Sequence, residues 1–215
     1  MKKFNTPLGE IKIDILGHAS LFMQWKGKNI YVDPYSEVAD YSKLPSADFV
    51  LLTHHHFDHL DKEALKHIVN EQTLFVTNRG CKAELPQANA LTQGDSYNYE
   101  GIEITAVYAY NIVNKNEQGE PFHPRGEGNG YILDFNGYRL YIAGDTEHIP
   151  EMKELGEIDL AFMPKNLPYT MSDQMFIEAL KTVMPKQLFA IHYFEIDVPK
   201  LKEMMPQGVE LLNEK

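Results

Sequence analysis

The sequence predicts an α/β protein in which helices cover β-sheets within one layered domain. Short apolar segments typical of strands fill the N-terminal half, and later such segments alternate with helical patterns. Residues 172–183 carry apolar side chains at helical spacing, which indicates a helix packed on a sheet. A chain of 215 residues has the length of one large domain. We therefore expect a single domain over residues 1–215.

The first strands are predicted near the N-terminus. Residues 11–16 alternate apolar and polar side chains with a period of two, which indicates a strand with one buried face. Segments 20–25 and 30–32 follow as strands joined by a short turn. Pro34 ends this run, because proline cannot continue a central strand. Asp33 is either a turn carboxylate or a group near a metal loop, and the sequence alone favours the turn.

The rest of the chain continues this alternation. The apolar residues of 65–69 favour a short helix. Asn136-Gly137 joins two strands as a hairpin turn, and Ser172 is placed to cap a helix. In order, the other expected elements are strands at 48–52, 74–77, 102–108, 131–135, 139–143 and 158–163, a helix at 172–183, a strand at 187–191 and a helix at 197–205. Residues 111–128 are polar and aperiodic, and a loop of that length is usually functional or mobile.

Composition argues against several classes of protein. The formal net charge of −11 makes nucleic acid an unlikely partner, because such proteins neutralise phosphates. The single cysteine, Cys81, cannot form an internal disulfide, which fits a cytoplasmic location. No run approaches the ~20 apolar residues of a membrane span. We expect a cytoplasmic protein with a small-molecule substrate, and we leave assembly into a homo-oligomer open.

One histidine-rich loop organises the sequence. His54, His56, Asp58 and His59 form a His-x-His-x-Asp-His pattern between an apolar strand and a helix. Neutral imidazole and carboxylate groups suit divalent metals such as zinc. Four ligands are too many for one ion that keeps an open position, so the spacing indicates two ions. The alternative is a surface histidine cluster such as a tag, but a tag is terminal and lacks the preceding strand.

Two further candidate ligands follow predicted strands. Asp145 comes after the strand at 139–143, and Gly144 before it permits a close approach of backbone. His192 comes directly after the strand at 187–191. Either residue alone is compatible with an ordinary loop start. Three strand ends that carry histidine or aspartate make coincidence less plausible.

The ordered motifs His54-x-His56-x-Asp58-His59, Gly144-Asp145-Thr146 and His192 resemble the metallo-β-lactamase superfamily of hydrolases. The resemblance covers nearly the whole chain, and segments 17–20 and 32–34 resemble the branch of L-ascorbate-6-phosphate lactonase-like proteins. It implies a four-layer αβ/βα sandwich with the site along one edge. It also assigns His54 and His56 to a first metal, Asp58, His59 and His192 to a second, and Asp145 to a bridge between them.

The chain departs from the family at the third ligand of the first metal. Members usually carry a histidine after the strand that corresponds to 104–109, where this chain has Asn111. Asn111 coordinates through its amide oxygen, or His123 swings in from the long loop, or the first site is only partly filled. We favour His123, although a loop histidine that faces water is an equal alternative.

The resemblance and the charge of two ions together predict a hydrolase. Two divalent ions about 3.5–4 Å apart share a water and lower its pKa towards ~7. The metal-activated hydroxide would attack an ester, lactone or phosphodiester of a small molecule, and Asp58 or Asp145 would shuttle the proton. Zinc is the first expectation, with manganese, nickel or iron as alternatives.

Polar residues on loops at strand ends are candidates for substrate binding. Arg125 or Lys165 would grip a phosphate or carboxylate as a charge-assisted donor, unless these are simply solvated charges. The full candidate set is His18, Asn111, Arg125, Lys165, Asn166 and Tyr169.

Three rival functions remain. The first is a catalytically weak metal-binding protein of the same fold. The second is a phosphodiesterase that acts on nucleic acid or lipid. The third is a diiron oxidoreductase, but such proteins carry a glutamate where this chain has His56 and add a flavin domain.

Overall fold

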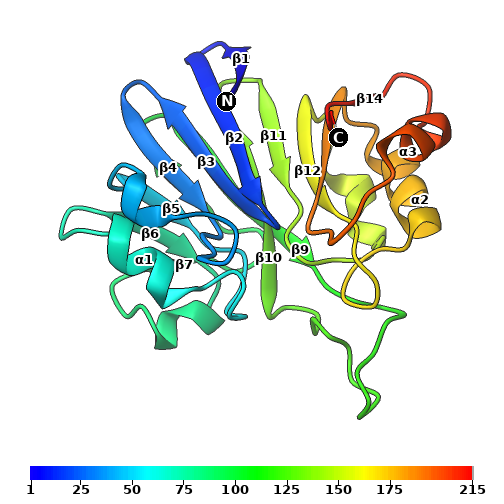
Figure 1. Ribbon diagram of the computed structural model, residues 1–215, viewed down its shortest axis with the longest axis horizontal. Helices are drawn as coiled ribbons and strands as arrows, with labels where there is room; N and C mark the ends of the chain where they lie inside the picture. Colours follow the sequence, from blue (N-terminus) through cyan, green and yellow to red (C-terminus); the bar gives the residue numbers. More distant parts are fainter. Residues whose placement is uncertain (215) are drawn as a thin grey trace.

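The computed structural model describes residues 1–214, so the last residue of the expected domain, 215, lies outside the described residues. Two seven-stranded sheets face each other (Figure 1). The first contains, in spatial order, β1 (Lys2–Thr6), β2 (Gly9–Gly17), β3 (Ser20–Trp25), β4 (Lys28–Val32), β5 (Phe49–Leu51), β6 (Leu74–Thr77) and β7 (Asn89–Ala90). The second runs in reverse order through β14 (Glu210–Leu211), β13 (Gln187–Ile191), β12 (Leu160–Pro164), β11 (Arg139–Ile142), β10 (Gly128–Asp134), β9 (Ile102–Ala109) and β8 (Ser96–Tyr99).

Helices cover the outer faces of both sheets. The first sheet carries α1 (Lys62–Ile68), and the second carries α2 (Asp173–Val183) and α3 (Val198–Met204) (Figure 1). Short 3₁₀ helices lie at Tyr41–Lys43, Pro150–Glu154 and Gly80–Ala83. As expected, the Ser172 side chain accepts a hydrogen bond from the Met175 backbone N–H and caps α2. The arrangement confirms the predicted αβ/βα sandwich.

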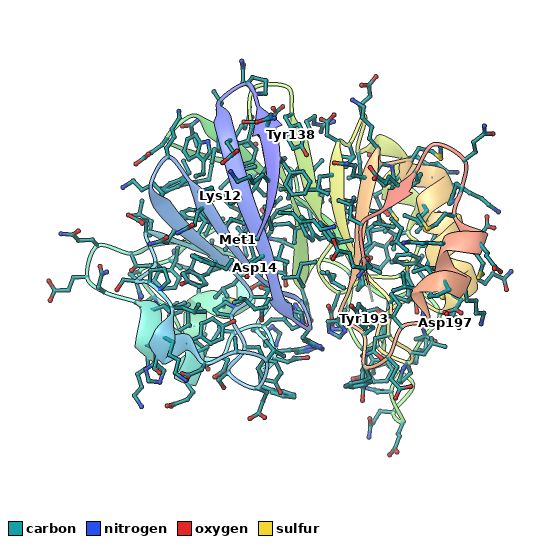
Figure 2. All side chains as sticks on the ribbon, turned by 45° about the horizontal axis from the view of Figure 1, so that its top comes forward. Met1, Lys12, Asp14, Tyr138, Tyr193 and Asp197 are labelled. Atoms are coloured by element: carbon teal, nitrogen blue, oxygen red, sulfur yellow. The ribbon has the colours of Figure 1, made fainter. Side chains whose placement is uncertain are left out.

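The strand periodicity explains why the core has layers. In β4, Ile30 and Val32 pack between the two sheets, whereas Tyr31 packs under α1. In β13, Phe189 and Ile191 face the space between the sheets, whereas Leu188 and Ala190 pack in the cluster that contains α2. Because successive side chains point to opposite faces, one apolar run serves two cores. Side chains fill the molecule on both sides of each sheet (Figure 2).

Parallel pairing directs several strand ends to one edge. Strands β4 to β7 are parallel neighbours, and so are β11 to β14. The carboxyl ends of parallel strands share an edge, where loops collect to form sites. Asp33 follows β4, the histidine loop follows β5, and Asp145 and His192 follow β11 and β13. The long loop between β9 and β10, green in Figure 1, extends from the lower edge of the molecule.

Four strands were not anticipated from the sequence. β7 and β14 have two residues each, too few to show periodicity. β1 and β8 are each the outermost strand at one edge of a sheet, and their sequences, KKFNT and SYNY, are largely polar. Edge strands need only one paired side and a few buried contacts, so their sequences carry a weak signal. Within residues 1–214, no helix has both the length and the apolar character needed to cross a bilayer.

A buried tyrosine joins the two sheets beside the histidine loop. The Tyr131 hydroxyl of β10 donates to the backbone carbonyl of Leu52 at 2.9 Å and accepts from Asn129 Nδ2 at 3.1 Å. Tyr131 is completely buried. The hydrogen bond therefore fixes the start of the histidine loop relative to the second sheet.

We predict that Tyr131→Phe lowers the free energy of unfolding by about 1–3 kcal/mol, because the buried Leu52 carbonyl loses its donor. Tyr141→Phe is the matched control, since the Tyr141 hydroxyl is buried and has no hydrogen-bond partner among residues 1–214. The control should leave the free energy of unfolding unchanged or slightly higher. Urea denaturation followed by circular dichroism measures both, and equal losses would contradict the prediction.

Candidate metal centre

The histidine loop is a tight turn between β5 and α1. The backbone carbonyl of His56 accepts from the N–H groups of His59 (3.0 Å) and Leu60 (2.8 Å). This turn directs several imidazoles inwards. His54 and His59 are buried, whereas His55, at the variable position of the motif, is exposed.

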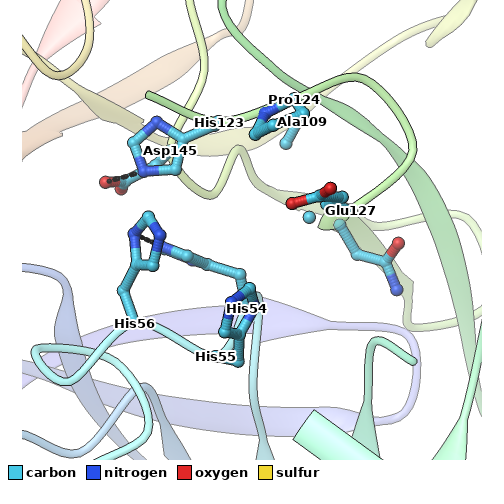
Figure 3. A pocket seen from close by; sticks show the side chains of 10 residues that line it. His54, His55, His56, Ala109, His123, Pro124, Glu127 and Asp145 are labelled. Carbon is cyan, nitrogen blue, oxygen red and sulfur yellow. Dashed lines mark hydrogen bonds and ion pairs between the residues drawn. The ribbon is translucent and has the colours of Figure 1, made fainter. Parts of the chain in front are cut away.

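Residues from distant strands meet this loop at Asp145. Asp145 Oδ1 lies 3.5 Å from His59 Nε2, while Oδ2 lies 3.0 Å from His192 Nε2 and 3.3 Å from His123 Nε2. His123 and Asp145 face the His54–His56 pair across the pocket (Figure 3). The structure thus brings together all seven residues predicted from the sequence as metal ligands.

Ligand atoms cluster in three overlapping groups. In each group, one nitrogen or oxygen atom from every residue lies within 4.8 Å of the others. The groups are His54, His56 and His123; His54, His59 and Asp145; and His18, Asp58, His59 and His192. The first and third groups share no residue, and each could hold an ion.

Buried polar atoms test whether a metal fits here. His59 Nε2, His192 Nε2 and Asp145 Oδ1 are buried and make no well-aligned hydrogen bond among the described residues, although both nitrogens lie within ion-pair distance of the Asp145 carboxylate. Such atoms are rare, since each typically costs about 1–3 kcal/mol when left unpaired. All three lie at the Asp145 carboxylate. A divalent cation would satisfy them, so the residues fit a metal ion.

The protonation states of three candidate ligands suit metal binding. Burial lowers the pKa of His54 well below its usual value and lowers the pKa of His56 to about 4, so both imidazoles are neutral. Burial alone would raise the pKa of Asp145, but His192 and His59 outweigh it and hold the pKa well below its usual range. Neutral imidazole and ionised carboxylate are the forms that coordinate metals. In contrast, burial alone would lower the pKa of His59, but Asp145 and Asp33 outweigh it and hold the pKa well above its usual value, so this imidazole must release a proton when it binds a metal.

Asp33 has a role that the sequence did not favour. Its carboxylate accepts from the Thr53 N–H (2.8 Å) and hydroxyl (2.6 Å) and lies 2.8 Å from His59 Nδ1. The prediction of an ordinary turn carboxylate is therefore wrong. Asp33 is buried and orients His59, as carboxylates commonly do for metal-binding histidines. The pairing of β4 with β5 places it there, which the sequence does not reveal.

Left-handed backbone geometry recurs at this edge. His18, Asp33 and His192 have φ values of 51°, 43° and 55°. Non-glycine residues adopt this region only when their surroundings impose it, and it often marks functional sites. Here the His192 N–H donates to the His18 carbonyl at 2.8 Å. Gly144 has φ 64°, and a Cβ on it would lie 2.6 Å from the Asn129 carbonyl oxygen, so glycine is required before Asp145.

His18, predicted to touch substrate, lies against the candidate ligands. Its Nε2 is 3.0 Å from Asp58 Oδ2, and its ring centroid is 3.8 Å from that of His192. Burial alone would raise the pKa of Asp58, but the hydrogen bond with His18 and the charge of His59 bring it to about 2. His18 therefore orients an ionised Asp58.

Asn111 and His123, the two candidates for the third ligand, contact each other. Asn111 Oδ1 accepts from the His123 N–H at 2.9 Å and lies 2.7 Å from His123 Nδ1. With the Asn111 oxygen engaged in this way, His123 Nε2 is left to face Asp145. The geometry favours His123 as the ligand and Asn111 as the group that orients it.

A buried glutamate that the sequence analysis missed holds the base of the long loop. Glu147 accepts from the backbone N–H groups of residues 112, 113 and 114, each at 2.7 Å, and from Asn111 Nδ2 at 3.2 Å. It is 1% exposed. The only sequence signal is its position two residues after Asp145, and the polar loop that it binds lies more than thirty residues earlier.

The other substrate candidates divide into two sets. Asn166 and Tyr169 line a cleft beside the metal centre. Arg125 instead pairs with Glu151 at 2.8 Å and lies over the Tyr108 ring. Lys165 pairs with Asp173 at 2.6 Å and lines an adjoining depression. The structure does not bring either cation to the metal centre.

Two facing sheets with imidazoles and carboxylates gathered at one edge define a metallo-hydrolase class of αβ/βα sandwich. Comparison with known proteins agrees, because residues 12–192 match the β-lactamase superfamily domain. The chain belongs to the metallo-β-lactamase superfamily of hydrolases.

Similar proteins include one named as a metal-dependent hydrolase from Methanosarcina barkeri, 28% identical over 205 residues, with 88% of this chain and 86% of that protein covered. A crystal structure described as a metal-dependent hydrolase from Parabacteroides distasonis is 39% identical with a TM-score of 0.91, covering 98% of this chain and 96% of the other. A metallo hydrolase from Ignicoccus hospitalis shares the fold, with 22% identity, a TM-score of 0.74 and coverage of 94% and 95%.

We predict that Asn111→Ala weakens metal binding by about 10–100-fold, because His123 loses the partner that fixes its ring and backbone. Titration of zinc into the metal-free protein against a chromophoric chelator measures this. Asn114→Ala is the matched control: Asn114 ties the same loop to the Thr170 carbonyl at 3.0 Å without touching His123. Equal affinities in the two variants would refute the orienting role.

Proposed function

We propose that this chain is a dinuclear metal-dependent hydrolase of small-molecule esters, lactones or phosphodiesters. The observation that carries the proposal is the position of Asp145 between two ligand groups. It lies 3.3 Å from His123 on one side and 3.0 Å from His192 on the other. A carboxylate in that position can bridge two ions, with His54, His56 and His123 on the first and Asp58, His59 and His192 on the second.

The bound ions would supply Lewis acidity, which lowers the pKa of water and polarises the scissile group. The residues of the chain hold the ions and accept the proton. Asp145 is almost fully buried and surrounded by imidazoles, which suits a bridging ligand. Asp58 is only partly buried and lines the cleft, so its Oδ2 can accept a proton on the substrate side. His18 Nε2 holds that oxygen at 3.0 Å.

The names of the relatives support hydrolysis that depends on a metal, without identifying the ion or the substrate. Mixed histidine and carboxylate ligands favour zinc, with manganese, nickel or iron as alternatives. A single domain over residues 1–215, a cytoplasmic location and possible homo-oligomer formation remain predictions from the sequence. A catalytically weak metal-binding protein is the competing outcome.

We predict that Asp145→Asn removes both the bound metal and the activity, because the amide cannot bridge two cations. Elemental analysis should give about two ions per chain in the wild type and fewer than one in the variant. Turnover of a lactone and of bis(4-nitrophenyl) phosphate provides the activity measurement. Asp14→Asn is the control, because Asp14 is half exposed on β2 and pairs with the N-terminal ammonium group, and this variant should keep metal and activity.

Thermal unfolding of both variants shows whether the chain still folds. Two bound ions and full turnover in a folded Asp145→Asn protein would disprove the proposal. Two ions in the wild type without turnover on either substrate would favour the metal-binding protein without catalysis.

A further inference from the structure

The metal centre opens onto a cleft of about 940 Å³. That volume is in the range of small-molecule sites. His56, Asp58 and His192 form part of its wall, so a molecule in the cleft touches the proposed metal ligands. Tyr193, another lining residue, is labelled in Figure 2 in the right half of the molecule, below its centre.

Aromatic side chains form a large part of the cleft lining. They come from five different loops of the two sheets and comprise Tyr35, Phe57, Phe122, Tyr169, Tyr193 and Phe194. Tyr35 and Phe57 form an edge-to-face pair with centroids 6.1 Å apart, and Phe122 and Tyr169 form another at 5.1 Å. Such pairs provide preformed faces for a further aromatic ring.

Two of these rings are unusually exposed. Phe57 is 75% exposed and Phe194 is 78% exposed, higher than any other large apolar side chain among residues 1–214. Each belongs to a loop that carries candidate metal ligands: Phe57 lies between His56 and Asp58, and Phe194 lies two residues after His192. Exposed apolar groups that gather beside a polar site mark a binding surface.

Acidic side chains outnumber cationic ones among the described residues that line the cleft. Besides Asp58 and Asp145, the lining contains Glu37 and Asp61, and no lysine or arginine of the described chain lines it. Ser36 donates both its backbone N–H and its hydroxyl to the Asp61 carboxylate. A phosphate or sulfonate bound beside Glu37 and Asp61 would be repelled by their carboxylates and would find no lysine or arginine in the cleft lining.

We propose that the substrate carries an uncharged aromatic group, or an apolar group of similar size, that occupies this cleft while its scissile bond lies at the metal centre. The inference rests on the proposed hydrolase function and narrows its substrate class. For an ester, water adds across the acyl C–O bond: the acyl carbon gains the oxygen of water, and the leaving oxygen takes a proton. The products are an alcohol and a carboxylic acid, which then ionises.

The test uses the metal-loaded full chain and three 4-nitrophenyl esters that share one leaving group. Their acyl groups are acetyl, phenylacetyl and 4-sulfophenylacetyl, and each kcat/KM is divided by the rate constant for hydrolysis by hydroxide. The phenylacetyl ester should exceed both others by about tenfold or more. Equal values for the three esters would overturn the inference.

Variants connect the preference to the cleft. Phe57→Ala and Phe194→Ala should each lower the phenylacetyl-to-acetyl ratio of kcat/KM by about three- to tenfold. Leu74→Ala removes an exposed apolar side chain from β6 and should leave that ratio unchanged. Glu37→Lys should raise kcat/KM for the sulfonated ester relative to the phenylacetyl ester by about fivefold or more. Ratios that stay constant in all three cleft variants would also overturn the inference.

A binding measurement separates this inference from the hydrolase proposal. Saturation-transfer NMR on the metal-free protein should detect binding of the uncharged amide N-phenethylacetamide. Its binding should be weaker in Phe57→Ala, and the wild-type protein should not bind the sulfonated analogue of this amide. If two ions bind but neither the esters nor bis(4-nitrophenyl) phosphate react, the proposed hydrolase function fails. The NMR experiment still shows in that case whether the cleft binds an uncharged aromatic ligand. Equal binding of both amides would contradict an uncharged ligand.

Discussion

The constraint on which this structure depends is the burial of carboxylate and imidazole groups where the two sheets meet. Asp145 is 5% exposed and His59 is fully buried, yet atoms of both make no well-aligned hydrogen bond among the described residues. Buried charge is tolerated only when other charges or a metal compensate it. The local geometry serves this purpose, because Gly144 lets the chain approach closely enough to place Asp145 among three histidines.

A second set of polar residues holds the candidate ligands in position. Asp33 orients His59, Asn111 orients His123, and His18 orients Asp58. Glu147 in turn ties the long loop that carries His123 to the segment after β11. The loop is therefore ordered at its base by a buried carboxylate, which explains how a long polar segment can deliver a metal ligand.

Both sheets contribute to metal binding and to the aromatic cleft. The first sheet supplies the histidine loop with its exposed Phe57, and the second supplies Asp145, His192 and Phe194. Ligands and aromatic rings alternate along the same loops, so the metal centre and the aromatic cleft form one continuous surface. The two cations of the chain that seemed suited to grip an anionic substrate, Arg125 and Lys165, are neutralised by Glu151 and Asp173.

The sequence by itself determined the layered α/β class, most of the long strands, the cap of α2 and the identity of the candidate ligands. Most of these features rest on local spacing: a period of two, a period of 3.6, or four ligand-type residues within one loop. The candidate ligands outside that loop came from the ends of predicted strands and from the family resemblance. Short edge strands such as β7 and β14 were not predicted, because two residues are too few to show a period in hydrophobicity.

Only the tertiary structure decided which distant residues meet. It brought His123 rather than the oxygen of Asn111 to face Asp145, placed Asp33 behind His59, and turned Arg125 away from the centre. The physical reason is that such contacts depend on strand pairing and sheet packing, which join residues far apart in the chain. A local pattern specifies which side chains can bind a metal, but the packing of the sheets specifies which of them share an ion.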